Sequence, residues 1–258
     1  MTYFFFILLI LFIRAGRYFL RAHIGEKMEK IERVGFTVEP EQLFDILKPK
    51  AMSVTTAEIV QASNDVAVVR LADGRVGMLP VTEFYPNKKW GTGNRYPVAL
   101  LENNSARPIV SVACDEIIEL LAPAFVPELR EGRVRVMGIA RRVGIRSKIA
   151  VAPTEEGLDA VGLFVGKAAN RVAGISRSLC GERVDVVAYS ENKEVFIKNA
   201  LGVKVVDIEI KNNSAVVRVP THQIDAAIGG GGLNAYLAAK LVGIKISILA
   251  IEENEKSI

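Results

Sequence analysis

The chain has 258 residues, half of them hydrophobic, which is enough for two or three small domains with packed cores. Its formal net charge of +4 and isoelectric point of about 9.0 make it mildly basic, which by itself identifies no partner. The two cysteines, Cys114 and Cys180, and the two histidines form no C-x-x-C or metal-ligand spacing, which argues against a disulfide framework or a zinc site.

The first 50 residues have an uncertain role. An uninterrupted apolar run at residues 3–13 is shorter than the roughly 20 residues that a membrane-spanning helix needs. It lacks the flanks of a signal peptide, and three arginines follow it within eight residues. A weak membrane anchor, a true start at Met28 and a remnant helix of a lost domain stay open; we favour the last two and expect no stable membrane association. Apolar spacing predicts a helical pattern over residues 24–48.

Residues 51–114 are expected to form a small β-barrel. Short β-like runs are separated by turn signals such as Asp73-Gly74. The runs are residues 57–60, 66–71, 75–80, 98–101 and 108–112. Five short strands of this kind predict an OB-fold, the common RNA-binding version of such a barrel. Between the third and fourth runs lie three candidates for stacking on bases, although they can equally be core residues: Phe84, Tyr85 and Trp90.

Residues 115–189 carry the pattern of a first mixed α/β domain. A helix over residues 115–121 is followed by strands at 133–136 and 148–151, which the loop 141–146 joins. Asp159 is placed to cap a short helix that ends at Val165. A second helix and a strand complete the domain, and they are predicted from apolar spacing at Val172, Ile175 and Leu179 and from the run 184–187.

Residues 190–258 repeat this order as a second domain. The pattern predicts a helix over 194–201 and strands over 203–210 and 215–219, followed by a helix over 221–228. A further helix starts at Leu233 and stops at Gly243, and a strand over 244–251 ends the domain. The predicted fold class is therefore α+β and multidomain: a five-stranded OB-fold barrel followed by two modules of the order helix-strand-strand-helix-helix-strand.

Two glycine-rich turns occupy matching places in the two modules, 63 positions apart in the chain. The first consists of Gly166, Lys167, Ala168 and Ala169, and the second consists of Gly229, Gly230, Gly231 and Gly232. A turn of this type between two helices lets backbone N–H groups approach a phosphate at the positive end of a helix dipole. A KH module clamps single-stranded RNA in this way. The alternative for the second turn is a plain flexible connector.

A basic segment runs from Arg130 to Lys148, with Glu131 as its one acidic residue. Such a density of positive charge is a candidate phosphate-binding surface, and its alternative is a solvated face. The residues from which we expect RNA contacts are Arg141, Arg142, Arg146, Ser147, Lys148, Lys167, Arg171 and Asn234, together with the two glycine-rich turns.

Several stretches resemble the family of the bacterial transcription termination/antitermination factor NusA. They are Arg141 with residues 144–151, Gly181-Glu182 with residues 184–187, and residues 226–229 with Asn234-Ala235 and residues 237–241. The resemblance covers roughly three quarters of the chain, and the barrel matches more in pattern than in residues. It implies an OB-fold of the ribosomal S-one type, two tandem KH domains of the bacterial type and binding of nascent single-stranded RNA.

The resemblance also implies that RNA polymerase and other transcription elongation factors are partners, and that polymerase pausing, termination and antitermination are the processes affected. The chain departs from the family by a short N-terminal part in place of a polymerase-binding domain, which bears on direct polymerase contact. It also has Ala169 where Gly is usual, and Gly230, Leu233 and Tyr236 where Lys, Gln and Arg are usual. Each turn is therefore expected to lose part of its interactions with phosphate.

No Ser/His/Asp, Cys/His or paired-carboxylate arrangement points to catalysis, so we expect no enzyme, no metal, no cofactor and a cytoplasmic location. Two other functions stay open. The first is an RNA-decay or ribosome-associated accessory protein, because OB-fold and KH modules also occur there. The second is a membrane-tethered RNA binder that uses the apolar run at residues 3–13.

Overall fold

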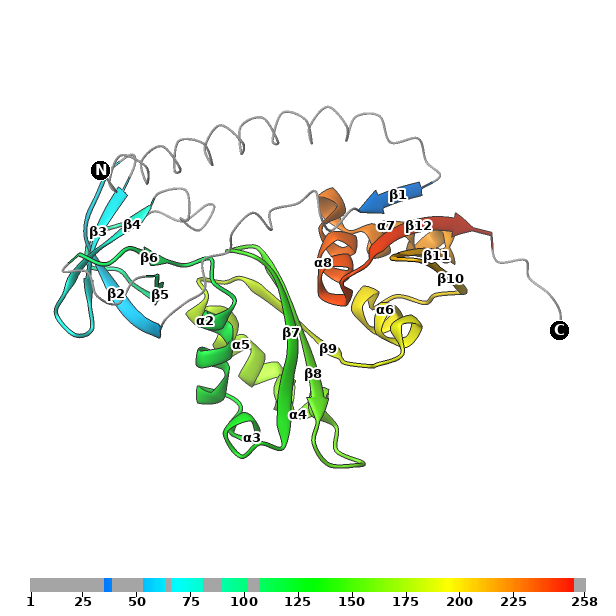
Figure 1. The fold of residues 1–258 in the computed structure, drawn as a ribbon, viewed down its shortest axis with the longest axis horizontal. Helices are drawn as coiled ribbons and strands as arrows, with labels where there is room; N and C mark the ends of the chain where they lie inside the picture. Colours follow the sequence, from blue (N-terminus) through cyan, green and yellow to red (C-terminus); the bar gives the residue numbers. More distant parts are fainter. Residues whose placement is uncertain (1–34, 39–52, 64–65, 81–89, 102–106, 253–258) are drawn as a thin grey trace.

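The structure is a computed structural model, and it describes residues 35–38, 53–63, 66–80, 90–101 and 107–252. These residues form three β-sheets with their helices, which follow one another along the chain. Figure 1 shows the barrel in cyan at one end, the first α/β unit in green and the second α/β unit, from α6 to β12, in yellow to red at the other end. The predicted fold class is confirmed.

The barrel is built from five strands in the order β4-β3-β2-β5-β6. They are β2 (Ser53–Ala62), β3 (Val66–Leu71), β4 (Val76–Pro80), β5 (Arg95–Leu100) and β6 (Val110–Ser111). A parallel bridge between Met78 and Ile109 joins β4 to the segment before β6 and closes the sheet on itself. Gly77 permits this closure, because a Cβ there would lie 2.8 Å from the carbonyl oxygen of Pro108.

The first α/β unit wraps its helices against one face of the sheet β7-β8-β9, in which β8 and β9 are parallel. Its elements are α2 (Glu116–Leu121), η3 (Ala122–Ala124), α3 (Pro127–Arg130), β7 (Val134–Arg142), β8 (Arg146–Pro153), α4 (Ala160–Val165), η4 (Lys167–Ala169), α5 (Asn170–Ser178) and β9 (Arg183–Ala188). The predicted cap at Asp159 is confirmed, since its carboxylate accepts the N–H of Gly162 at 2.9 Å.

The loop predicted between the first two strands of this unit is shorter than expected. Arg141 and Arg142 belong to β7, where they pair with Ser147 and Arg146 of β8. Only residues 143–145 form the turn. The long antiparallel ladder extends the hairpin, which brings its turn against the barrel core at Val143.

The second α/β unit repeats the first with a sheet in which β11 and β12 are parallel. Its elements are α6 (Lys193–Leu201), β10 (Asp207–Lys211), β11 (Ser214–Pro220), η5 (Thr221–Gln223), α7 (Ile224–Ile228), η6 (Gly230–Gly232), α8 (Leu233–Val242) and β12 (Lys245–Ile251). Gly243 ends α8 in the left-handed conformation with φ of 76°, as predicted. The strand predicted from Val203 begins instead at Asp207.

The helical pattern predicted over residues 24–48 is wrong at β1 (Gly35–Val38). This strand pairs antiparallel with β12 and adds a fourth strand to the second unit's sheet, in the order β1-β12-β11-β10. The apolar spacing of residues 24–48 could not reveal this strand. The unpaired backbone groups at the edge of a sheet favour an extended partner, and the edge in question belongs to β12, far away in the sequence. The rest of residues 24–48 lies outside the described residues.

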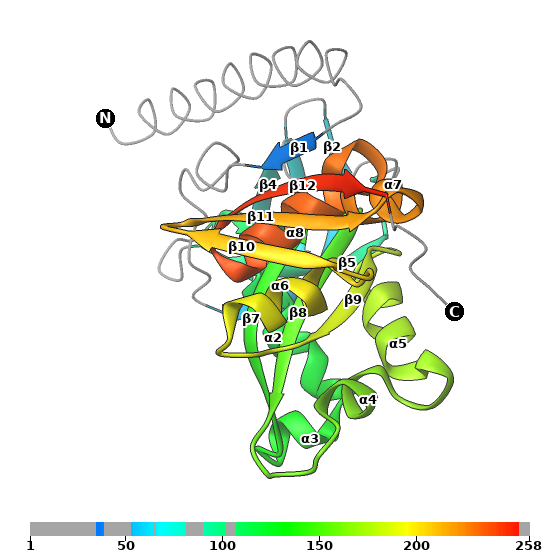
Figure 2. The same cartoon turned by 90° about the vertical axis from the view of Figure 1, so that its right-hand side faces the viewer.

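Helix α8 joins the two α/β units, because it packs on β7 and β8 as well as on its own sheet. Both views place α8 between the β7–β8 hairpin and the sheet of the second unit (Figures 1 and 2). The first unit contributes small residues to the shared core, namely Ala140 and Ala150, and Gly138 lies near Leu241. A helix buried on most of its surface must be apolar on most faces, and α8 is buried from Asn234 to Ala239.

We predict that Ala150→Leu destabilises the protein by about 1–3 kcal/mol, because extra methylene groups in this filled space force β8 and α8 apart. Ala150 is fully buried in the core that it shares with α8. The free energy of unfolding from urea titration measures the effect. Ala188→Leu at an exposed position of the same sheet is the control, and equal effects of the two substitutions would contradict close packing at Ala150.

Candidate nucleic-acid interface

The two glycine-rich turns have matching backbone angles at their first, third and fourth positions. Gly166 has φ 76° and ψ 168°, and Gly229 has φ 73° and ψ 165°. Two further matched pairs are left-handed, Ala168 with Gly231 and Ala169 with Gly232. Each turn leads directly into the next helix, α5 or α8. The repeat seen in sequence therefore extends to the backbone that would face a ligand.

The first glycine of each turn cannot be replaced without moving its neighbours. A Cβ on Gly166 would lie 2.5 Å from the side-chain oxygen of Asn170. A Cβ on Gly229 would lie 2.7 Å from the Cβ of Asn234. Both residues also have positive φ, so their glycines are required by conformation and by space.

The first turn places two alanines where glycine is favoured. Ala168 has φ 51° and Ala169 has φ 57°, and both are exposed. A left-handed conformation costs an alanine roughly 1–2 kcal/mol. The sequence singled out Ala169 as a departure from the family, and the structure adds Ala168. The first turn thus adopts the same shape as the second at a cost in backbone strain.

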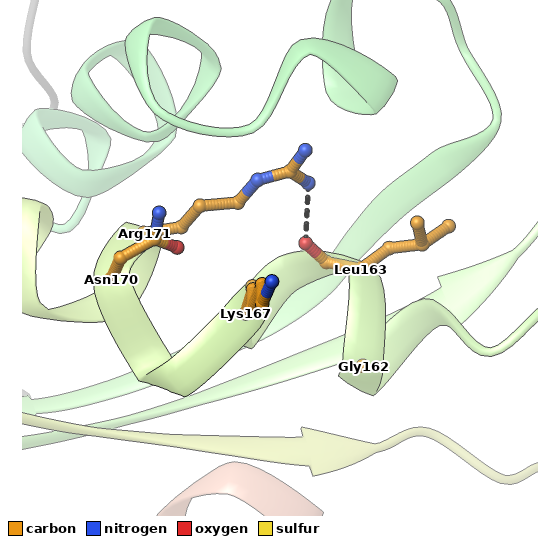
Figure 3. A pocket seen from close by; sticks show the side chains of 6 residues that line it. Gly162, Leu163, Lys167, Asn170 and Arg171 are labelled. Carbon is orange, nitrogen blue, oxygen red and sulfur yellow. Dashed lines mark hydrogen bonds between the residues drawn. The ribbon is translucent and has the colours of Figure 1, made fainter.

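A side chain of the second helix braces each turn at the same point. Arg171 Nη1 donates to the carbonyl of Leu163 at 2.6 Å, and Asn234 Nδ2 donates to the carbonyl of Ala226 at 3.3 Å. Leu163 and Ala226 are also 63 positions apart. Figure 3 shows Arg171 extending across to Leu163 from the far side of the turn. The geometry gives these two predicted RNA contacts a role in holding the turns closed.

Each brace has further partners that fix it in place. Arg171 Nη1 also pairs with Glu128 of α3 at 2.8 Å. Burial alone would raise the pKa of Glu128, but backbone hydrogen bonding and Arg171 outweigh it and lower the pKa. Asn234 is buried, and its Nδ2 also donates to the carbonyls of Leu201 and Ala227, each at 3.0 Å. It therefore fastens the ends of α6 and α7 to the start of α8.

An open hollow of about 250 Å³ lies beside the first turn. It is lined by Gly162, Leu163, Gly166, Lys167, Asn170 and Arg171 (Figure 3). Lys167 is exposed at its edge and makes no ion pair with a described residue. The hollow can therefore accept a negatively charged group beside a free ammonium.

Arg141, a predicted RNA contact, is buried and not available on the surface. Its Nε donates to Glu182 Oε1 at 2.8 Å and its Nη2 to Glu182 Oε2 at 3.0 Å. Glu182 also accepts the N–H of Gly144 at 2.7 Å and the hydroxyl of Ser147. Ser147, another predicted contact, is fully buried in the same cluster. The sequence could not show this, because an arginine that pairs with a buried glutamate and an arginine on the surface can have the same local sequence.

The same arginine ties the first α/β unit to the barrel. Its Nη1 donates to the carbonyl of Val112 at 2.9 Å and to that of Cys114 at 3.0 Å. These carbonyls belong to the segment that leaves the barrel after β6. Arg141 therefore connects the last strand of the barrel, the β7–β8 hairpin and the start of β9.

Two further predicted cations share one carboxylate on the neighbouring strand. Asp185 of β9 pairs with Arg146 Nη2 at 2.5 Å, with Lys148 Nζ at 3.2 Å and with Arg183 Nε at 3.1 Å. Burial raises the pKa of Asp185, but the charges of Lys148 and Arg146 outweigh it and lower the pKa. Burial lowers the pKa of Lys148, and Asp185 opposes the shift. One carboxylate facing three cations leaves the cluster positive, although Lys148 itself is buried.

Arg142 is an exposed cation at the end of β7, and it makes no ion pair within the described part of the chain. Trp90 is half-buried and packs on Tyr96 with ring centroids 4.4 Å apart. It lies on the barrel core together with Val143 and Cys180 of the first α/β unit. Phe84 and Tyr85, the other candidates for base stacking, lie outside the described residues.

Comparisons with known proteins identify both α/β units. Residues 114–189 match the family model of the NusA-like first KH domain, and residues 193–256 match that of the NusA-like second KH domain. These two matches cover more than half of the chain.

Relatives over a longer stretch carry the name transcription termination/antitermination protein NusA. The protein of Thermus thermophilus is 32% identical over 88% of this chain and 59% of its own length. The protein of Mycobacterium bovis is 34% identical over 67% of this chain and 52% of its own. The protein of Bacillus subtilis is 36% identical over 66% of this chain and 48% of its own. The chain thus spans about half the length of these relatives.

Within the part of the chain that the structure describes, no helix has both the length and the apolar character needed to cross a bilayer.

We predict that Arg141→Ala destabilises the protein by about 3–5 kcal/mol, because it leaves the buried carboxylate of Glu182 without its counter-ion. Arg142→Ala, which removes the adjacent exposed arginine, should change stability by less than about 0.5 kcal/mol. Chemical denaturation of the two variants measures the difference. Similar losses in both variants would show that the Arg141–Glu182 pair does not hold the junction.

We predict that Ala169→Gly tightens RNA binding and changes stability by less than about 1 kcal/mol. Glycine relieves the left-handed strain in the folded state, while the greater freedom of the unfolded chain offsets the gain. It also removes a Cβ from the exposed face of the turn. RNA titration and thermal unfolding of the variant check both parts, and unchanged affinity would show that this position does not touch the RNA backbone.

Proposed function

This chain belongs to the family of NusA-like proteins, and from that premise we propose that it binds single-stranded RNA and modulates the pausing, termination and antitermination of RNA polymerase. The observation that carries the proposal is the pair of turns with matching backbone conformation, each at the start of a helix in a NusA-like KH domain. Backbone N–H groups at such a place attract phosphate, and KH modules use them to hold single strands.

We assign RNA contacts to the groups that the fold leaves accessible. These are the first turn, Gly166–Ala169, the second turn at Gly229, Gly230 and Gly231, and the exposed cations Lys167 and Arg142; Gly232, predicted as a contact, is buried. The cluster around Asp185 adds a positive field through Arg146 and Arg183. This surface is held in place by hydrogen bonds, described above, from four residues that we do not assign to RNA contacts: Arg141, Ser147, Arg171 and Asn234. The proposed role is therefore binding, and no step of it needs catalysis or a cofactor.

The proposed organisation places RNA-binding modules in series. An OB-fold barrel occupies residues 51–114, and the KH domains occupy residues 115–189 and 190–258. We propose a cytoplasmic location and RNA polymerase as the protein partner, by similarity to relatives named for transcription termination and antitermination. Recovery of polymerase with the purified full chain, rather than of ribosomes or nucleases, separates this function from an accessory role in RNA decay or translation.

We predict that binding of a single-stranded RNA weakens steeply with salt. If about four phosphates are neutralised, the logarithm of affinity should fall against the logarithm of salt concentration with a slope near −3, at roughly 0.7 per phosphate.

Gly230→Asp together with Gly231→Asp should lower affinity more than tenfold. At an effective dielectric constant near 20, two like charges about 4 Å apart repel by roughly 4 kcal/mol before screening.

The control for this pair is Gly230→Asn with Gly231→Asn, which adds side chains of the same shape without charge. Position 230 has space for a side chain, and Asp and Asn tolerate the left-handed conformation of position 231. Melting temperatures should therefore change little in both variants. Full retention of RNA affinity in the Asp variant, with an unchanged melting temperature, would show that this turn is only a connector.

A further inference from the structure

The two turns share a shape but differ in charge. Lys167 and Gly230 are at matched positions, 63 residues apart, and both are exposed. The first turn therefore carries an ammonium where the second carries no side chain. From Gln223 to Ala239, the one charged side chain is the carboxylate of Asp225. No cation near in sequence replaces the missing one.

The second turn nevertheless has a backbone that no side chain covers at Gly230 and Gly231. Gly230 and Gly231 are exposed, and a Cβ built on Gly230 would meet nothing within 4 Å. The N–H groups at the start of α8 have the same orientation relative to their own turn as those at the start of α5, because the backbone angles match. A ligand can thus approach the peptide groups of this turn more closely than those of the first, where the methyl groups of Ala168 and Ala169 intervene.

On the basis of the function proposed above, we propose that the two KH turns hold RNA by different forces. The first turn anchors a phosphate by the charge of Lys167. The second turn binds the sugar–phosphate backbone by main-chain N–H groups and close contact alone. Salt weakens RNA binding by competing with cations that neutralise phosphates. The second turn therefore supplies a part of the affinity that salt does not weaken.

This division of roles has a consequence for how RNA leaves the protein. As salt rises, the contact at Lys167 loosens while the contact at Gly229–Gly232 persists. The RNA then remains held at the second KH domain after its segment on the first has become free. The uncharged turn also places no positive charge that would attract duplexes or other polyanions without regard to fit.

Three substitutions at position 230 and one at position 167 test the proposal in the full chain. The probe is a fluorescently labelled single-stranded RNA of about 12 nucleotides, which can occupy two modules of four nucleotides each. Affinity is measured over a series of salt concentrations, so that each variant yields a binding strength and a salt slope. Circular dichroism confirms that each variant is folded.

Lys167→Ala should make the salt slope shallower by about 0.7, because one phosphate contact is lost. Gly230→Leu should weaken binding by the same factor, roughly tenfold, at every salt concentration, since it blocks close approach without changing charge; tenfold corresponds to about 1.4 kcal/mol. Gly230→Lys should steepen the slope by about 0.7. Gly230→Ala is the matched control, and its slope should equal that of the unmodified chain.

Two results would overturn the proposal while leaving the proposed function intact. In the first, RNA binds with a steep slope, but Gly230→Leu does not lower the affinity and Gly230→Lys does not change the slope, so the second turn does not touch RNA. In the second, Gly230→Leu makes the slope shallower, so the second turn does neutralise a phosphate. A chain that binds no RNA at any salt concentration would instead contradict the function itself.

Discussion

The buried ion pair between Arg141 and Glu182 is the interaction on which the arrangement of the barrel and the first KH domain depends. Both side chains are excluded from solvent, and their charges are satisfied by two parallel hydrogen bonds and by the peptide groups around them. A buried pair of this kind is sensitive to the loss of either partner. It lies where the barrel, the β7–β8 hairpin and β9 meet, so it fixes the hairpin turn against the barrel and leaves Arg142 on the outside.

A second constraint acts on the other face of the same sheet. The sheet β7-β8-β9 is covered by α4 and α5 on one side and by α8 on the other, and the side facing α8 has the small residues Ala140 and Ala150. Helix α8 begins at the second glycine-rich turn, so the packing that joins the two KH domains also orients that turn. The positions of both turns are thereby set by buried contacts rather than by the linker between the domains.

The order of elements was predictable from sequence because apolar spacing, turn residues and caps agree along most of the chain, as at Asp159 and Gly243. The turns were predictable too, since their glycines stand in matched surroundings. The sequence could not reveal which cations are surface cations. Arg141, Arg146 and Lys148 look alike in a basic segment, but their environments depend on Glu182 and Asp185. These two carboxylates lie at the start of β9, more than 35 residues further along the chain. Strand β1 was missed for a similar reason, because its partner β12 lies at the other end of the chain.

The two braces give the two turns different sensitivity to acid. Arg171 holds the first turn with the help of Glu128, whose pKa lies below the usual glutamate value, so its contribution to stability is complete above that usual value. As pH falls through the lowered pKa, Glu128 is protonated and this contribution is lost. Asn234 has no ionisable group, and its acceptors are the backbone carbonyls of Leu201, Ala226 and Ala227. The same backbone shape is thus maintained in the first domain by a brace that depends on an ionised carboxylate, and in the second domain by a brace that has no titratable group.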